Sequence, residues 1–247
     1  MPLFRTITQI FILLLLAGTS PAQAGEVRAA VAANFTAAMK EIAAQFEQAS
    51  GHRLIASYAS TGKLYAQIAN GAPFDVFLAA DQRRPQLLEE KHVADGRFTY
   101  AIGKLVLWSS DSGRQVNSTS LAQADFNKLA IANPKTAPYG AAAVEVLRKL
   151  GVYETLGNRL IKGDSIAQTH QFVATGNAEL GLVALAQIAL DDSGSRWVVD
   201  ESLYTPLRQD AVLLARGRYN DAALALLDYL RSDAAKAITH KYGYGTE

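Results

Sequence analysis

Apolar residues in this chain fall into short runs that alternate with longer stretches of helical spacing. Residues 27–33 form an apolar run of mostly small side chains, which predicts a first strand. Over 35–47 the apolar positions lie three or four residues apart, as in an amphipathic helix, and Gly51 follows where a C-cap is expected. The same alternation predicts strands at 54–58, 75–79, 100–108, 129–132, 160–162, 180–184, 197–199 and 211–215, and helices at 64–69, 82–91, 140–150, 166–174, 221–230 and 234–240.

This alternation of strands and helices predicts an α/β fold with parallel, doubly wound sheets. The apolar run Val76, Phe77 and Leu78 is typical of a strand buried on both faces. The chain contains more strand–helix units than one small sheet needs, and no linker rich in Gly or Ser divides them. Two lobes joined by strand-like crossovers satisfy both observations.

The first 24 residues have the layout of a secretory signal peptide. One early cation, Arg5, precedes an apolar run at 10–17, and a small-x-small triplet at 22–24 precedes the expected cleavage site. The apolar run is too short for a membrane anchor, because spanning a bilayer takes about 20 apolar residues. We therefore expect cleavage after Ala24 and a mature periplasmic protein that begins at Gly25.

Composition excludes several classes of protein. The chain has 24 basic and 23 acidic residues, and losing Arg5 with the leader makes the formal charge zero. Nucleic-acid-binding proteins usually show a basic excess, which is absent here. Without cysteine there is no disulfide, thiolate metal site, cysteine nucleophile or lipid-bearing residue of a lipoprotein. With 49% hydrophobic and 19% charged residues, the chain is globular.

Enzyme motifs are mostly missing. Residues 60–63 (STGK) resemble the end of a phosphate-binding P-loop, but Ser57 stands where its first glycine belongs. Leu64 follows the lysine where Ser or Thr would bind magnesium, so we reject that interpretation. His170 has no Ser–carboxylate partner placed by the sequence, and a catalytic triad is not expected. The other three histidines are interpreted as surface residues: His52, His92 and His240.

Polar residues at four strand-to-helix turns are the candidates for ligand binding. In open parallel sheets, ligands bind beyond the carboxyl ends of the strands, at the N-termini of the following helices. Free backbone N–H groups and the helix dipole favour an anion there. Each polar residue can equally cap its own helix, as Asp81 is expected to do for the helix at 82–91. The four turns are 33–36, 59–63, 133–140 and 163–166.

Four segments around these turns resemble periplasmic molybdate-binding proteins of ABC importers. They are 32–39 (AANFTAAM), 58–68 (YASTGKLYAQI), 71–81 (GAPFDVFLAAD) and 133–140 (NPKTAPYG), and the third is specific to this family and its near oxyanion-binding relatives. The resemblance extends over 25–247. It implies two doubly wound α/β lobes of the type II periplasmic binding protein fold, joined by a hinge, with the ligand cleft between them. We expect one lobe to comprise 25–103 plus 208–247 and the other 104–207.

The resemblance also implies how the ligand is held, namely by neutral hydrogen-bond donors with no salt bridge. No residue ligates a metal directly, because molybdenum enters only as bound molybdate, and no cofactor is expected. A branch of the family has a ligand-contacting tyrosine where this chain has Ala184, so that residue is left out. The implied contacts are the Asn34 side chain and backbone N–H, the Thr61 hydroxyl and backbone N–H with Ser60 beside it, Tyr139, and the Ile166 backbone N–H.

The function implied is a monomeric receptor that binds molybdate, and with it tungstate, and delivers it to the membrane permease of an ABC importer. A receptor for sulfate or another tetrahedral oxyanion is the nearest alternative. A periplasmic hydrolase on the same scaffold is a further one, although the chain lacks a nucleophile–base pair. The ligand-sensing half of a transcription regulator is opposed by the leader and by the missing helix-turn-helix. The sequence does not separate molybdate from tungstate.

Overall fold

The computed structural model describes residues 24–247, so the leader predicted at 1–24 lies outside the described part except for its last residue. The strands are β1 (Glu26–Ala32), β2 (Arg53–Ala59), β3 (Val76–Leu78), β4 (Ala94–Gly103), β5 (Leu105–Ser109), β6 (Leu129–Ala132), β7 (Leu160–Gly163), β8 (Leu180–Ala184), β9 (Ser195–Val198) and β10 (Leu207–Leu214). The α-helices are α2 (Thr36–Ser50), α3 (Thr61–Ala69), α4 (Arg83–Glu90), α5 (Ser118–Gln123), α6 (Pro138–Lys149), α7 (Tyr153–Leu156), α8 (Ile166–Ala174), α9 (Asp221–Arg231) and α10 (Asp233–Lys241).

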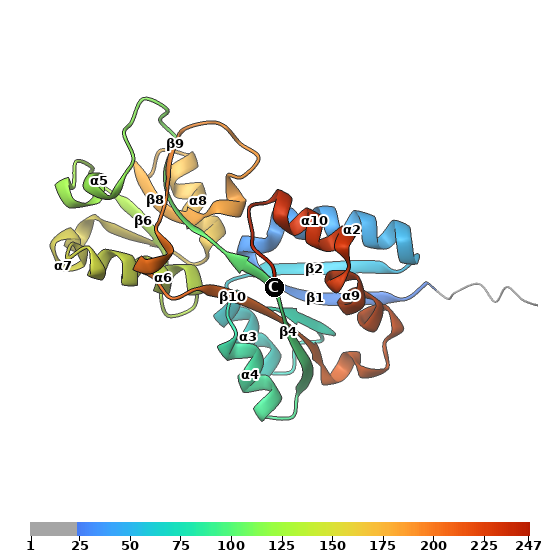
Figure 1. Ribbon diagram of the computed structural model, residues 1–247. Helices are drawn as coiled ribbons and strands as arrows, with labels where there is room; N and C mark the ends of the chain where they lie inside the picture. The colour runs from blue at the N-terminus through green and yellow to red at the C-terminus, as the bar shows by residue number, and fades with distance from the viewer. Residues whose placement is uncertain (1–23) are drawn as a thin grey trace, which may run out of the picture.

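The described chain forms two α/β lobes, each built on a five-stranded sheet (Figure 1). The first sheet has the order β2-β1-β3-β10-β4, and the second has the order β7-β6-β8-β5-β9. In both, three neighbouring strands are parallel and the fourth strand runs antiparallel to both of its neighbours. The predicted two-lobed α/β architecture is confirmed, but the sheets are mixed and not purely parallel.

Two crossovers connect the lobes. Lys104 separates β4 of the first sheet from β5 of the second, and residues 199–206 connect β9 back to β10. The single strand predicted at 100–108 is therefore wrong, because the chain changes lobes at Lys104, within that run. Figure 1 shows β4 and β10 passing through the junction, where they pair as antiparallel neighbours.

The helices form where the sequence provides an apolar face and an end signal. In α2 the buried residues are Ala38, Met39, Ile42 and Phe46, and Gly51 ends the helix with φ = 73°, its N–H donating to Glu47 O. A left-handed residue at this position suits glycine, which has no Cβ to clash. Burial of each large apolar side chain of this face contributes about 1.5–3 kcal/mol.

Two short helices were not predicted, α5 and α7. In α5 only Leu121 is buried, so its apolar pattern is weak. The helix is instead fixed by a reciprocal cap, in which Asn117 Oδ1 accepts from Ser120 N while Ser120 Oγ accepts from Asn117 N. Within residues 24–247, no helix has the length and apolar character needed to cross a membrane.

Candidate functional site

All five residues proposed from the sequence line one small cavity between the lobes. The cavity is nearly closed, with a volume of about 10 Å³, far below the roughly 300–1,000 Å³ of a typical small-molecule pocket. Helix or 3₁₀ N-termini from both lobes meet there, and neutral side chains surround it. The lining residues are Ala32, Ala33, Asn34, Ser60, Thr61, Ala80, Ala137, Pro138, Tyr139 and Ile166.

The first turn carries Asn34, in the short 3₁₀ segment Ala33–Phe35 between β1 and α2. The side chain of Asn34 is buried, and its amide nitrogen donates two hydrogen bonds within the protein. One goes to Gln209 Oε1 at 2.7 Å and the other to Tyr244 Oη at 3.0 Å. In return, Tyr244 Oη donates to the Asn34 carbonyl at 2.8 Å. In this conformation the side chain holds the turn in place, and the expected ligand contacts through the Asn34 side chain and backbone N–H stay predictions.

The second turn carries Ser60 and Thr61, which begin α3 and are 3% and 1% exposed. Thr61 Oγ1 accepts the backbone N–H of Ala80 at 3.0 Å. Ser60 Oγ is buried and has no hydrogen-bond partner among the described residues, and it makes no cap bond to its own helix. A buried hydroxyl without a partner is costly, so Ser60 is the residue of this turn that most needs a ligand.

The third turn carries Tyr139, at the second residue of α6 after Pro138. Pro suits the first helical position because its missing N–H would have no partner there. Gly140 lets the helix approach β6, since a Cβ at this position would lie 2.7 Å from the carbonyl carbon of Ala132. The Tyr139 hydroxyl is buried and accepts a hydrogen bond of 3.2 Å from Gln209 Nε2.

The fourth turn carries Ile166, the first residue of α8. Ser165 caps this helix by accepting from Gln168 N, and Gln187 Nε2 donates to the Ile166 carbonyl at 3.1 Å. The side chain of Ile166 is buried. The backbone N–H at the start of α8 is therefore held in a fixed position at the cavity. Ala184, at the end of β8, does not belong to the cavity lining.

The electrostatics of the cavity come from backbone dipoles and not from charged side chains. None of its lining residues is Lys, Arg, His, Asp or Glu. Burial raises the pKa of Tyr139 well above 10, and it does the same for the neighbouring tyrosines Tyr100 and Tyr244. These hydroxyls stay protonated at neutral pH, so the cavity offers hydrogen bonds from neutral groups and the positive ends of helices.

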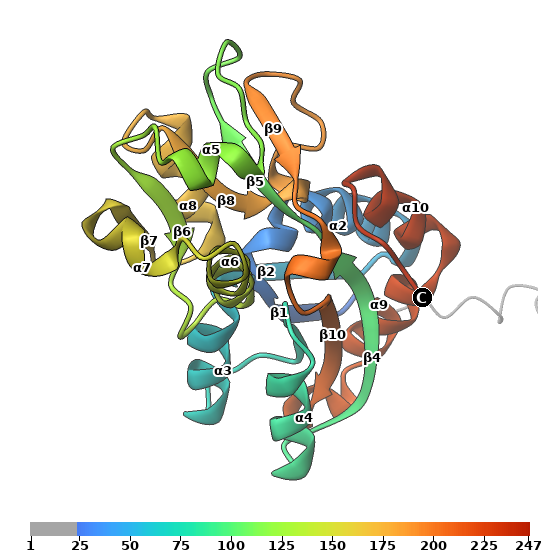
Figure 2. The same cartoon turned by 60° about the vertical axis from the view of Figure 1, so that its left-hand side comes forward.

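The contacts that hold the lobes together around this cavity include the following three. Gly62 N donates to Thr136 O at 2.8 Å, and Lys63 Nζ lies 2.9 Å from Asp164 Oδ2. The third contact is from the Arg84 side chain to the carbonyl of Lys135 at 3.2 Å. Figure 2 shows α6 of the second lobe directly above α3 of the first, where the first contact is made. The protein is therefore in a closed conformation.

Three functional candidates were missed by the sequence analysis, namely Gln209, Tyr100 and Tyr244. They surround Asn34 and Tyr139 from β10, β4 and the C-terminal segment. The available signal was the polar run 208–210, which stands between Leu207 and the apolar residues of the same strand. Gln209 and Asp210 of this run are buried. Tyr100 and Tyr244 give no comparable signal, because tyrosine is also common in ordinary cores.

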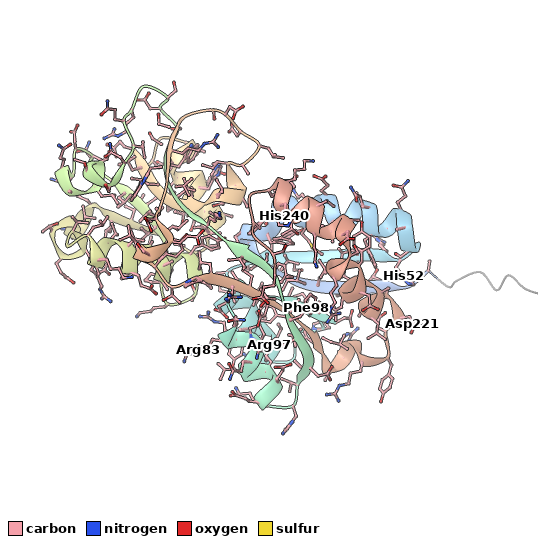
Figure 3. All side chains as sticks on the ribbon, in the orientation of Figure 1. His52, Arg83, Arg97, Phe98, Asp221 and His240 are labelled. Atoms are coloured by element: carbon pink, nitrogen blue, oxygen red, sulfur yellow. The ribbon has the colours of Figure 1, made fainter. Side chains whose placement is uncertain are left out.

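Asp81 and the histidines, which the sequence did not assign to the ligand site, lie outside the cavity lining. Asp81 accepts from Arg84 N at 3.0 Å at the start of α4, in agreement with the capping interpretation. His170 is half-buried and stacks on Trp108 with ring centroids 4.8 Å apart, so it is not a simple surface residue. Figure 3 shows His52 at the end of the first lobe farthest from the second, and His240 on α10. Within residues 24–247 no cluster of three or more His, Asp or Glu could hold a metal ion.

Comparison with known proteins gives a consistent result over most of the chain. A family model described as bacterial extracellular solute-binding protein matches residues 27–245. The molybdate-binding protein ModA of Azotobacter vinelandii is 56% identical over 232 residues, covering 92% of this chain and 92% of the relative. The protein of the same name from Rhodobacter capsulatus is 52% identical over 229 residues, covering 92% and 91%.

Solved structures agree with these matches. The periplasmic molybdate-binding protein of Azotobacter vinelandii superimposes with a TM-score of 0.86 at 38% identity, covering 90% of this chain and 99% of that one. The sulfate-binding protein SubI of Mycobacterium tuberculosis superimposes with a TM-score of 0.75 at 12% identity, covering 89% and 86%. The second likeness shows a shared fold alone.

Proposed function

Because this chain belongs to the family of bacterial extracellular solute-binding proteins, we propose that it is the receptor that captures molybdate for an ABC importer. The observation that carries the proposal is the neutral cavity between the lobes, where N-termini from both lobes meet and the Ser60 hydroxyl lacks a protein partner. Tungstate is bound as well, since it has the same charge and shape.

The five proposed ligand residues differ in the donor group that each offers to the ligand. Ser60 donates through its hydroxyl, and Thr61 donates through its hydroxyl hydrogen while its oxygen accepts from Ala80. Tyr139 is the ligand residue on α6, and the remaining donors to the ligand are the backbone N–H groups of Asn34 and Ile166. Hydrogen bonds to a charged group contribute about 1.5–3 kcal/mol each, so a few of them hold a dianion without a counter-charge.

Selectivity follows from the same neutral donors. A smaller anion leaves some buried donors unpaired, at a cost of about 1–3 kcal/mol each. A protonated anion such as phosphate near neutrality presents an O–H to a backbone N–H, which cannot accept a hydrogen bond. Binding requires both lobes to contact the ligand, so the ligand favours the closed conformation. We infer binding without catalysis, in keeping with relatives named as binding proteins.

The lobes are proposed as 25–103 plus 208–247 and 104–207, with the hinge at the two crossovers. In the closed, loaded state the protein presents its ligand to a membrane permease, and it acts as a monomer. The leader at 1–24 directs export and is removed after Ala24. N-terminal sequencing of the exported protein is expected to begin at Gly25, whereas a membrane-bound species retaining Met1 would contradict the proposed export.

The function is tested by measuring the melting temperature of the mature protein with molybdate, tungstate, sulfate and phosphate in parallel. A ligand at a thousandfold excess over its Kd stabilises the protein by about 4 kcal/mol. Molybdate and tungstate are expected to raise the melting temperature clearly, with little effect from the other two anions. Equal stabilisation by sulfate would replace the molybdate receptor with a sulfate receptor.

A further inference from the structure

Gln209 is a fully buried amide on β10, close to the point where the chain returns to the first lobe. Its side chain is 0% exposed, and the strand begins only two residues earlier at Leu207. Burying an amide is unfavourable unless its polar atoms are paired. In this protein they are paired, and the partners include two of the residues that line the ligand cavity.

The two ends of the Gln209 amide contact opposite lobes. Its Oε1 accepts from Asn34 Nδ2 at 2.7 Å, and its Nε2 donates to Tyr139 Oη at 3.2 Å. Asn34 belongs to the first turn of the site and Tyr139 to the third, which lies in the other lobe. Gln209 itself does not belong to the cavity lining. Its contribution to binding is therefore indirect.

A second, independent feature is the glycine at the end of the neighbouring strand β4. A Cβ at Gly103 would overlap the Tyr139 hydroxyl and would lie 2.6 Å from Gln209 Nε2. The φ angle of Gly103 is not positive, so the backbone conformation does not require glycine. The available space does, because the Tyr139 hydroxyl fills the position of the missing side chain.

Gly103 and Gln209 together form a site that we call the Tyr139 seat. It lies between two paired strands, β4 and β10, where Leu207 is the partner of Gly103. Each strand adjoins one of the crossovers, so the seat is located at the hinge. Tyr139 thus contacts the hinge with its hydroxyl while its own helix begins at the ligand cavity.

Resting on the proposed function, we propose that Gln209 is a positioning residue that couples hinge closure to oxyanion binding. In the closed protein the Tyr139 hydroxyl is in its seat, and the same amide holds Asn34 in the orientation that presents its turn to the cavity. Opening the hinge separates Tyr139 from the seat. Gln209 therefore stabilises the ligand-bound, closed state without touching the ligand.

The test measures molybdate binding by stopped-flow kinetics and calorimetry in Gln209→Leu, Tyr139→Phe and the double variant. Leucine has a similar volume but lacks the amide, and phenylalanine lacks only the hydroxyl. Gln209→Leu is expected to raise the dissociation rate about tenfold, which corresponds to about 1.4 kcal/mol, with little change in association rate. Because both changes break the same contact, the double variant is expected to lose less affinity than the sum of the two single losses.

Gln82→Leu is the control. Gln82 is also a side-chain amide, but it hydrogen-bonds only within the first lobe, to Thr99 and Asp210. Its loss is expected to lower stability while leaving the dissociation rate unchanged. Small-angle scattering adds a structural measurement, in which Gly103→Ala is expected to reduce the compaction caused by molybdate.

The outcomes separate this proposal from the one it rests on. If the unmodified protein does not bind molybdate, the proposed function fails, and this inference fails with it. If the unmodified protein binds and Gln209→Leu dissociates at the same rate, only the coupling role of Gln209 is overturned. Additive losses in the double variant would likewise show that Gln209 does not act through Tyr139.

Discussion

The backbone N–H of Gly62 donates a 2.8 Å hydrogen bond to the carbonyl of Thr136, joining α3 of one lobe to the turn before α6 of the other. A Cβ on Gly62 would lie 2.9 Å from Thr136 Cα and 3.0 Å from its carbonyl oxygen. These are backbone atoms, which cannot move aside as a flexible side chain can. Closure of the cleft thus depends on the missing side chain at position 62.

Gly62→Ala is therefore expected to weaken molybdate binding by at least about tenfold, the equivalent of 1.4 kcal/mol. The ligand-free protein should be as stable as before or slightly more so, because alanine favours a helix by up to about 1 kcal/mol over glycine. Calorimetry gives the affinity and denaturant unfolding gives the stability. An unchanged affinity would mean that this backbone contact does not form in the bound state.

Ser60→Ala and Thr61→Val are expected to differ in their effect on the stability of the ligand-free protein. The Ser60 hydroxyl has no partner among the described residues, so its removal should leave the ligand-free protein as stable as before while lowering affinity about tenfold to a hundredfold. Thr61→Val removes the acceptor for Ala80 N–H and should cost about 1–3 kcal/mol of stability. Urea unfolding and calorimetry on both variants measure the two effects. Normal affinity in Ser60→Ala would remove that hydroxyl from the site.

Lys63→Gln tests whether charge contributes to binding. The Lys63–Asp164 pair crosses between the lobes, but its side chains are 47% and 71% exposed, and exposed pairs contribute about 0–1 kcal/mol. We expect less than about a fivefold loss of affinity, reproduced by Asp164→Asn and abolished at high ionic strength. A loss larger than that of Ser60→Ala would show that the lysine charge acts on the ligand directly.

Stability is expected to fall in alkaline solution. Burial raises the pKa values of Tyr100, Tyr139 and Tyr244 well above 10 in the folded protein, while in the unfolded chain they titrate near 10. Above pH 10 the unfolded state therefore binds fewer protons than the native state, and unfolding becomes easier as the pH rises. The expected decline is about 1.4 kcal/mol per pH unit for each tyrosine.

Urea titrations between pH 8 and pH 11 measure this decline directly. Tyr139→Phe should reduce the slope by the contribution of one group, since phenylalanine has no proton to release. A slope that is unchanged in this variant would mean that Tyr139 titrates normally in the folded protein. Below pH 9 these tyrosines contribute no pH dependence, because they are protonated in both states.

The sequence predicted the parts of the fold that depend on local pattern. Apolar strands followed by polar turns identified all four turns of the site, and α8 and β8 begin and end where the pattern indicates. One strand was predicted over 100–108 although Gly103 and Lys104 interrupt its apolar run, whereas the lobe boundary was expected between 103 and 104 from the family resemblance. Gln209 was missed because its partners, Asn34 and Tyr139, lie 175 and 70 residues away in the chain. Such contacts exist only once both lobes are assembled.

The strand order has a consequence for how the chain folds. In the first sheet β4 is an edge strand whose only strand neighbour is β10, so residues 94–103 have no place in the sheet until residue 207 and those after it are available. A nascent chain ending near residue 199 thus holds a three-stranded fragment of the first lobe and the strands of a complete second one. Pairing over so large a sequence separation is slow, so the second lobe is expected to form first and the first lobe to be completed only after its C-terminal strand arrives.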